Sequence, residues 1–148
     1  MMASATKNRQ VWVLAALLLS ISANAQNSNP AARSLDKSVY DELAKVPAKA
    51  AARRNPLESD SEAVAAGAKL FELHCAECHG ATADGGKKGP SLRAGEVQQA
   101  TSGALFWLLT NGVVRKGMPV WSKLPEPQRW QLVSYVRSLG TPNKSPSQ

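Results

Sequence analysis

Five consecutive residues constrain this 148-residue chain more than any other feature. Cys75 and Cys78 are three positions apart, and His79 follows directly. On one turn of helix the two thiols face the same side, where both can bond to the vinyl groups along one edge of a porphyrin. The histidine is then placed to ligate the iron through one ring nitrogen. This spacing is typical of c-type haem attachment, so we predict one haem c, bound covalently through Cys75 and Cys78.

Two other chemistries use cysteines at this spacing. A redox disulfide would be expected within a βαβ pattern, and the sequence has none. A structural zinc site takes four ligands, but the chain has only two cysteines, and its two histidines are His74 and His79. Haem attachment is therefore the favoured interpretation.

The first 25 residues are typical of a secretory signal peptide. A positive start is followed by an apolar run over residues 11–21 and then by Ala23-Asn24-Ala25, a small-x-small cleavage pattern. The run is shorter than the roughly twenty residues that span a bilayer. We therefore expect cleavage before Gln26, export to the periplasm and no stable membrane insertion afterwards. Export agrees with the haem prediction, because bacterial c-type haem is attached outside the cytoplasm.

The rest of the chain divides into three parts. Residues 26–56 are rich in Ala, Lys and Arg and contain three prolines. They could form a flexible tether, a strip packed on the domain or a partner-docking extension, and we expect mostly a basic linker. The spacing of Val39, Leu43 and Val46 is compatible with a short helix over residues 38–45, which Pro47 would end. Residues 57–140 form the predicted domain, and residues 141–148 a disordered polar tail.

The predicted domain shows helical periodicity and no convincing strand pair. The first helix is expected to open at a capping box, Ser59-Asp60-Ser61-Glu62. A middle helix is expected over about residues 101–111, and the last one from Glu126-Pro127. Gly67 lies inside the first helix at a cost of about 1 kcal/mol against Ala. Close approach of another helix explains this glycine most simply. The alternative is a local loss of helix stability that the fold tolerates.

A second iron ligand is expected from Met118. A haem with one protein ligand can bind small molecules, whereas a stable sixth ligand favours electron transfer. Met118 is the only methionine after residue 25, lies well beyond His79 in the chain, and precedes Pro119, which stiffens the loop. His74 is adjacent to the attachment motif and poorly placed to reach the opposite face, so its simplest interpretation is an exposed residue at a helix end.

In these motifs the chain resembles the bacterial class I c-type cytochromes over about residues 57–140. The matching elements occur in family order: Gly67 and Phe71, Cys75 to His79, Gly89-Pro90-Ser91-Leu92, Met118-Pro119, then Leu132 and Tyr135. The resemblance implies an all-α fold of three to five helices around one covalently attached haem, with the first and last helices crossing near the glycine. It also implies that the Pro90 carbonyl accepts the other N–H of His79, that Leu92 packs on the haem, and that His79 and Met118 ligate the iron.

These features predict an electron carrier rather than an enzyme. The net charge of +7 arises from 18 basic and 11 acidic residues, but no run of five basic residues and few aromatics argue against nucleic-acid binding. Expected partners are redox proteins, namely a donor dehydrogenase and an acceptor oxidase or cytochrome. The chain itself is expected to be a monomer or a subunit of a complex. Five cations flank the predicted haem-edge loops, where they either steer an acidic partner or form an ordinary solvated surface: Lys87, Lys88, Arg115, Lys116 and Lys123.

Two alternatives stay open. One is that the chain is the electron-accepting cytochrome subunit of a larger periplasmic oxidoreductase, such as a quinoprotein dehydrogenase, docked through residues 26–56. Less favoured is a haem enzyme or gas sensor with Met118 off the iron, since no third histidine is present to supply distal acid–base chemistry.

Overall fold

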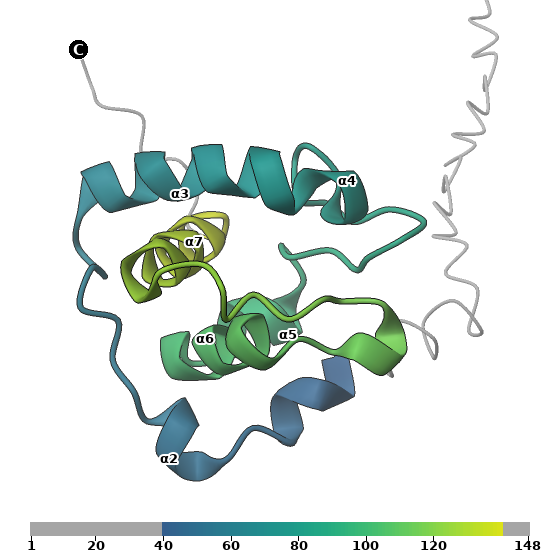
Figure 1. The fold of residues 1–148 in the computed structure, drawn as a ribbon, viewed down its shortest axis with the longest axis horizontal. Helices are drawn as coiled ribbons and strands as arrows, with labels where there is room; N and C mark the ends of the chain where they lie inside the picture. Colours follow the sequence, from purple (N-terminus) through teal and green to yellow (C-terminus); the bar gives the residue numbers. More distant parts are fainter. Residues whose placement is uncertain (1–39, 141–148) are drawn as a thin grey trace, which may run out of the picture.

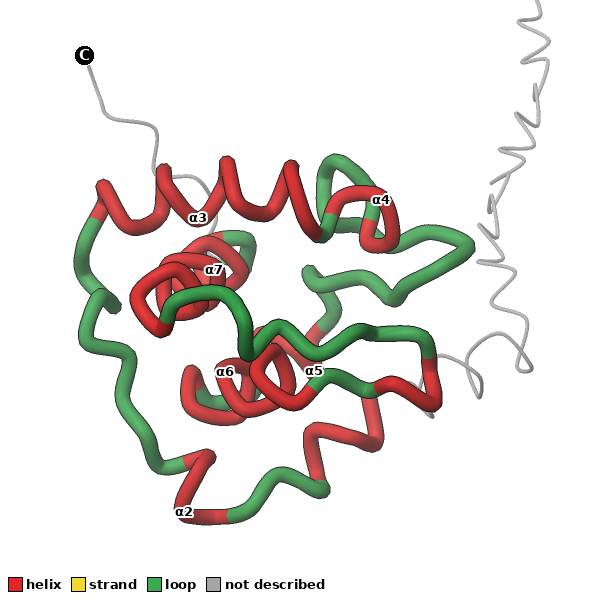
Figure 2. The backbone as a smooth tube through the Cα atoms, in the orientation of Figure 1, coloured by secondary structure: helices red, strands yellow, loops and turns green. Residues whose placement is uncertain are grey.

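The computed structural model describes residues 40–140, so the predicted signal peptide, the start of the extension and the tail lie outside the described residues. Three longer helices, α3, α6 and α7, are joined by loops and shorter helical turns (Figures 1 and 2). The bounds are α2 Ala48–Ala51, α3 Ser61–His74, α4 Ala76–His79, α5 Gly95–Gln99, α6 Ser102–Asn111, the 3-10 turn η1 Val114–Lys116, and α7 Glu126–Ser138. Residues 40–44 are also helical. The described part contains no strand beyond one isolated bridge, which confirms the all-α prediction.

The first helix begins differently from the predicted capping box. Asp60, not Ser59, is the N-cap of α3, and its carboxylate accepts hydrogen bonds from the backbone N–H groups of Glu62 and Ala63 at 2.8 and 3.1 Å. A carboxylate is favoured at this position because it also faces the positive end of the helix dipole. The predicted helix is therefore present, with the neighbouring residue as its cap.

The crossing of α3 and α7 explains Gly67. Figure 1 shows α3 lying across α7, which is viewed nearly along its axis. A Cβ built on Gly67 would lie 2.0 Å from the backbone oxygen of Gln131 and 2.9 Å from Cβ of Tyr135. Only a glycine lets the two backbones approach this closely. The ring of Phe71 packs 5.2 Å from that of Tyr135, so the crossing near the glycine with aromatic packing is confirmed.

The two later helices follow their predicted bounds closely. Thr101 caps α6 by accepting the N–H of Ala104 at 3.2 Å, and Gly112 ends it with φ of +66°, a conformation that favours glycine. Helix α7 begins at Glu126 with Pro127 in its first turn, where the missing N–H of proline costs nothing. No helix of residues 40–140 is both long enough and apolar enough to cross a membrane.

The second half of the predicted extension is packed against the domain rather than forming a free linker. Helix α2 lies against α6 so closely that a Cβ on Gly103 would be 2.3 Å from the carbonyl oxygen of Ala50. The Thr101 hydroxyl donates to the carbonyl of Ala51 at 2.7 Å. Asn55, only 5 % exposed, donates to the Ser134 hydroxyl of α7 at 2.8 Å. These contacts join segments that are distant in the sequence, so composition alone does not reveal them.

Two clusters form the core. One contains Phe71, Ala83, Leu109 and Leu132, next to the attachment motif. The other contains Phe106, Trp130 and Val133. In the second cluster the rings of Phe106 and Trp130 stack with centroids 3.9 Å apart. The guanidinium groups of Arg53 and Arg129 lie 4.6 and 4.8 Å from the Phe106 centroid, which ties the extension to the same core.

Candidate haem site

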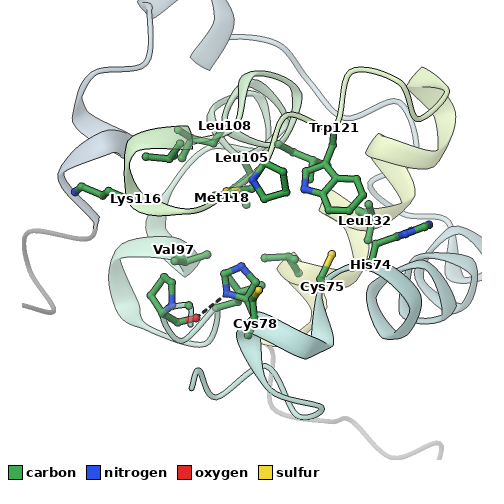
Figure 3. Close-up of a pocket in the computed structure, with 18 of the residues that line it drawn as sticks. His74, Cys75, Cys78, Val97, Leu105, Leu108, Lys116, Met118, Trp121 and Leu132 are labelled. Atoms are coloured by element: carbon green, nitrogen blue, oxygen red, sulfur yellow. Dashed lines mark hydrogen bonds between the residues drawn. The ribbon is translucent and has the colours of Figure 1, made fainter. Parts of the chain in front are cut away.

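The attachment motif forms the predicted turn of helix. Cys75 ends α3, and the backbone N–H groups of Cys78 and His79 bond to its carbonyl at 3.0 and 2.9 Å. Figure 3 shows both sulfur atoms on the same side of an open space. Burial, and then the neighbouring Cys78, raises the pKa of the Cys75 thiol to about 11. A thiol held in its protonated form at neutral pH is a poor redox nucleophile.

His79 is held by the contact that the resemblance implied. Its Nδ1 lies 2.8 Å from the carbonyl oxygen of Pro90 (dashed line in Figure 3). Because a carbonyl can only accept, Nδ1 carries the proton and Nε2 keeps its lone pair for a metal. A Cβ on Gly89 would lie 3.2 Å from Cε1 and Nδ1 of His79. The loop before Pro90 therefore rests directly on the ring and restricts its rotation.

Met118 comes from a different part of the chain. It ends a loop closed by an isolated bridge, in which Val113 N–H donates to Met118 O at 2.9 Å and Met118 N–H donates to Val113 O at 3.2 Å. Gly112 and Gly117 have φ of +66° and +89° and make the turns of this loop. In Figure 3 Met118 lies across the open space from Cys75 and Cys78. The side chain is half-buried and packs against the Leu109 core cluster.

A cavity of about 380 Å³ brings these groups together. All six residues predicted for the site line it: Cys75, Cys78, His79, Pro90, Leu92 and Met118. The remaining walls are mostly apolar, with contributions from Phe71, Val97, Leu105, Leu108, Leu109, Trp121, Leu132, Val133 and Val136.

These residues fit a haem. An imidazole nitrogen and a thioether sulfur are the soft donors that iron takes in electron-transfer haems. The two thiols lie together at one edge, and the apolar walls suit a flat hydrophobic ring. Residues 40–140 contain no cluster of three or more His, Cys, Asp or Glu side chains able to hold a metal ion, which disfavours the zinc alternative.

Charged residues at the cavity are largely paired. Lys88 bonds to Glu77 at 2.5 Å, which raises the pKa of the lysine and lowers that of the carboxyl. Arg115 and Lys116 both pair with Glu42. Three of the five cations considered for partner steering are thus partly neutralised by a carboxylate, which weakens the field that they present to a partner.

Part of the cavity wall was not predicted from the sequence. Tyr40, Glu42 and Leu43 line it although they belong to the predicted extension. The helical spacing of Val39, Leu43 and Val46 was the available signal, since it marks an apolar face that needs a partner. His74 is exposed at the end of α3, as expected, and its ring lies 5.3 Å from that of Trp121.

Comparison with known families decides the assignment. The family model described as "Cytochrome C oxidase, cbb3-type, subunit III" matches residues 62–136, about half of the chain. The chain belongs to this cytochrome c family. The match includes the attachment motif, the Gly89-Pro90 loop and Met118, and ends within α7. A haem-bearing electron-transport domain is thus the class of protein to which this chain belongs.

A solved structure supports the same fold. Cytochrome cL from the marine methylotrophic bacterium Methylophaga aminisulfidivorans MPT matches with a TM-score of 0.51 and 24 % identity. The match covers 80 % of this chain and 71 % of that one. At this identity the likeness establishes the fold of the chain. A search of curated protein sequences gave no match.

Proposed function

We propose that this cytochrome c domain is a periplasmic single-haem electron carrier, attached through Cys75 and Cys78 and ligated by His79 and Met118. The observation that carries the proposal is the fixed His79 ring, bonded to Pro90 O at 2.8 Å, in a cavity that Met118 enters from another segment. The bound haem supplies a one-electron Fe(II)/Fe(III) couple.

The residues of this chain then have separate tasks. His79, oriented by Pro90, would bind the iron through Nε2, and the hydrogen bond from Nδ1 raises the basicity of the ring. The apolar walls exclude water and so limit the solvent reorganisation that accompanies a change of charge. Lys87 and Lys123, which are exposed and form none of the ion pairs among residues 40–140, are the cations best placed to attract an acidic redox partner.

The experiment uses the exported protein. Mass spectrometry of the denatured chain is expected to give the mass of residues 26–148 plus one haem, and a potentiometric titration a single reversible one-electron transition. A chain that loses its haem on denaturation would contradict covalent attachment. Two or more transitions, or an irreversible one, would contradict the single-haem carrier.

A second candidate is a cytochrome subunit of a larger periplasmic oxidoreductase, such as a quinoprotein dehydrogenase. The family description favours it, because it names a subunit of an oxidase. Gel filtration of the protein from its native host distinguishes the two. A free carrier elutes near its own mass of 15.8 kDa or less, whereas a subunit elutes with its complex.

A further inference from the structure

A segment that precedes the family-matched residues 62–136 lines the candidate haem cavity. Tyr40 is only 8 % exposed and its hydroxyl donates to the carbonyl of Ser91 at 2.9 Å. Ser91 directly follows Pro90, whose carbonyl holds His79. Residues 40–46 therefore lie against the loop that orients the proximal histidine.

Glu42 connects the same segment to the other side of the cavity. Its side chain is 14 % exposed and pairs with Lys45 at 2.8 Å, with Arg115, and with Lys116 at 3.7 Å. Arg115 and Lys116 belong to η1, inside the loop that ends at Met118. In Figure 1 the helical turn at residues 40–44 lies beside η1. One carboxylate thus bridges two segments more than seventy residues apart.

The Met118 loop has few other restraints on its outer side. Val114 is 69 % exposed, and the space around Gly117 is open, since a Cβ built there meets no atom within 4 Å. Two backbone bonds join Val113 and Met118 at the base of the loop, and these bonds break when the loop opens. Loops with exposed backbone and few buried contacts open at low free-energy cost. An ion pair between this loop and another segment therefore has a large effect on how often the loop opens.

We propose that Glu42 is a positioning residue for Met118. By pairing with Arg115 and Lys116 it ties residues 40–46 across the rim of the cavity to η1 and keeps the Met118 loop closed. The proposal rests on the proposed function, in which Met118 is the sixth ligand. It assigns to the extension a role in tuning the site rather than in linking domains.

The test uses the full-length, exported, haem-loaded protein and the variant Glu42→Gln, which keeps the size of the side chain and removes its charge. Two quantities are measured: CO association to the reduced protein, and exchange of the Val113 amide proton, which reports on the loop directly. Both are expected to rise roughly fivefold, the effect of losing ion pairs of this kind, while amides in α3 and α7 keep their protection. The matched control is Asp41→Asn, which removes the same charge from an exposed neighbour that pairs with no cation in residues 40–140.

A second variant removes the partner of Glu42 on the loop. Arg115→Gln is expected to raise both quantities, and the double variant Glu42→Gln/Arg115→Gln to raise them by less than the product of the single effects, because the two residues share one interaction. Arg115 is exposed, so this variant folds even where Glu42→Gln does not. Unchanged CO association and Val113 exchange in both single variants would overturn the proposal, as would an equal change in Asp41→Asn.

The failure of the proposed function is distinguishable from the failure of this tie. If the wild-type protein lacks a methionine-ligated spectrum, the ligand assignment is wrong, and the Val113 exchange still tests whether Glu42 holds the loop. If the wild-type spectrum is methionine-ligated and the variants behave like wild type, only the tie is wrong.

Discussion

Replacing Gly67 with alanine tests how closely α3 and α7 pack. A Cβ at this position would lie 2.0 Å from the carbonyl oxygen of Gln131, where real Cβ atoms essentially never approach closer than 3.0 Å. The obstructing atoms are backbone, so the two helices must separate by about an ångström or more. Overpacking of this kind costs about 1–3 kcal/mol, and the rigid obstacle favours the upper end. Alanine returns about 1 kcal/mol of helix propensity, leaving a net loss of about 2 kcal/mol.

The assay is thermal unfolding of the haem-loaded protein, followed by far-UV circular dichroism. A loss of about 2 kcal/mol lowers the melting temperature of a domain of this size by about 10 °C. Gly95→Ala is the matched control, because Gly95 is also helical but its Cβ would meet only the flexible Gln99 side chain at 3.6 Å. That variant is expected to be as stable as wild type or slightly more. A Gly67→Ala protein with the wild-type melting temperature would refute the close-packing argument.

Three further perturbations test the cofactor, an ion-pair cluster and a buried polar contact. The variant Cys75→Ala/Cys78→Ala is expected to be largely unfolded, since the small core depends on a covalently held apolar ring; native-like helicity in its circular dichroism spectrum would count against this. Hydrogen bonds from Lys45 and Arg115 lower the pKa of Glu42 from 4.5 to about 2, so its stabilisation is complete above pH 4.5 and is lost as the pH falls through about 2. The difference in unfolding free energy between wild type and Glu42→Gln should therefore be largest above pH 4.5 and shrink as the pH falls to about 2. A difference that persists undiminished at pH 2 would contradict the lowered pKa of Glu42. Asn55→Ala removes a buried donor to Ser134 and is expected to cost about 1–2 kcal/mol in chemical denaturation, whereas a cost near zero would mean that the bond is dispensable.

Local signals were sufficient to predict the three longer helices and six of the residues that line the cavity. The spacing of Cys75, Cys78 and His79 already predicts one turn of helix that presents both thiols to one edge of a porphyrin ring. Gly67 was informative because a glycine inside an amphipathic helix has few explanations besides a close neighbour. The Met118-Pro119 pair was informative because few other donors remain in the chain.

Contacts between distant segments were not predictable in the same way. Glu42 and Arg115 are 73 residues apart, and nothing in the composition of residues 26–56 distinguishes a paired carboxylate from a solvated one. The packing of Asn55 on Ser134 is equally non-local, so the extension was expected to be mostly linker. At the start of α3, Ser59 and Asp60 are both good caps, and only the backbone geometry selects the aspartate.

The measurement that tests the central claim most directly is the absorption spectrum of the oxidised, exported protein, compared between wild type and Met118→Ala. The class I resemblance implies a weak near-infrared sulfur-to-iron band when methionine is a ligand. We predict that wild type has this band, that Met118→Ala lacks it, and that only the variant binds CO readily when reduced. A wild-type protein without the band that binds CO unhindered would contradict His79/Met118 ligation and favour a haem with an open sixth position.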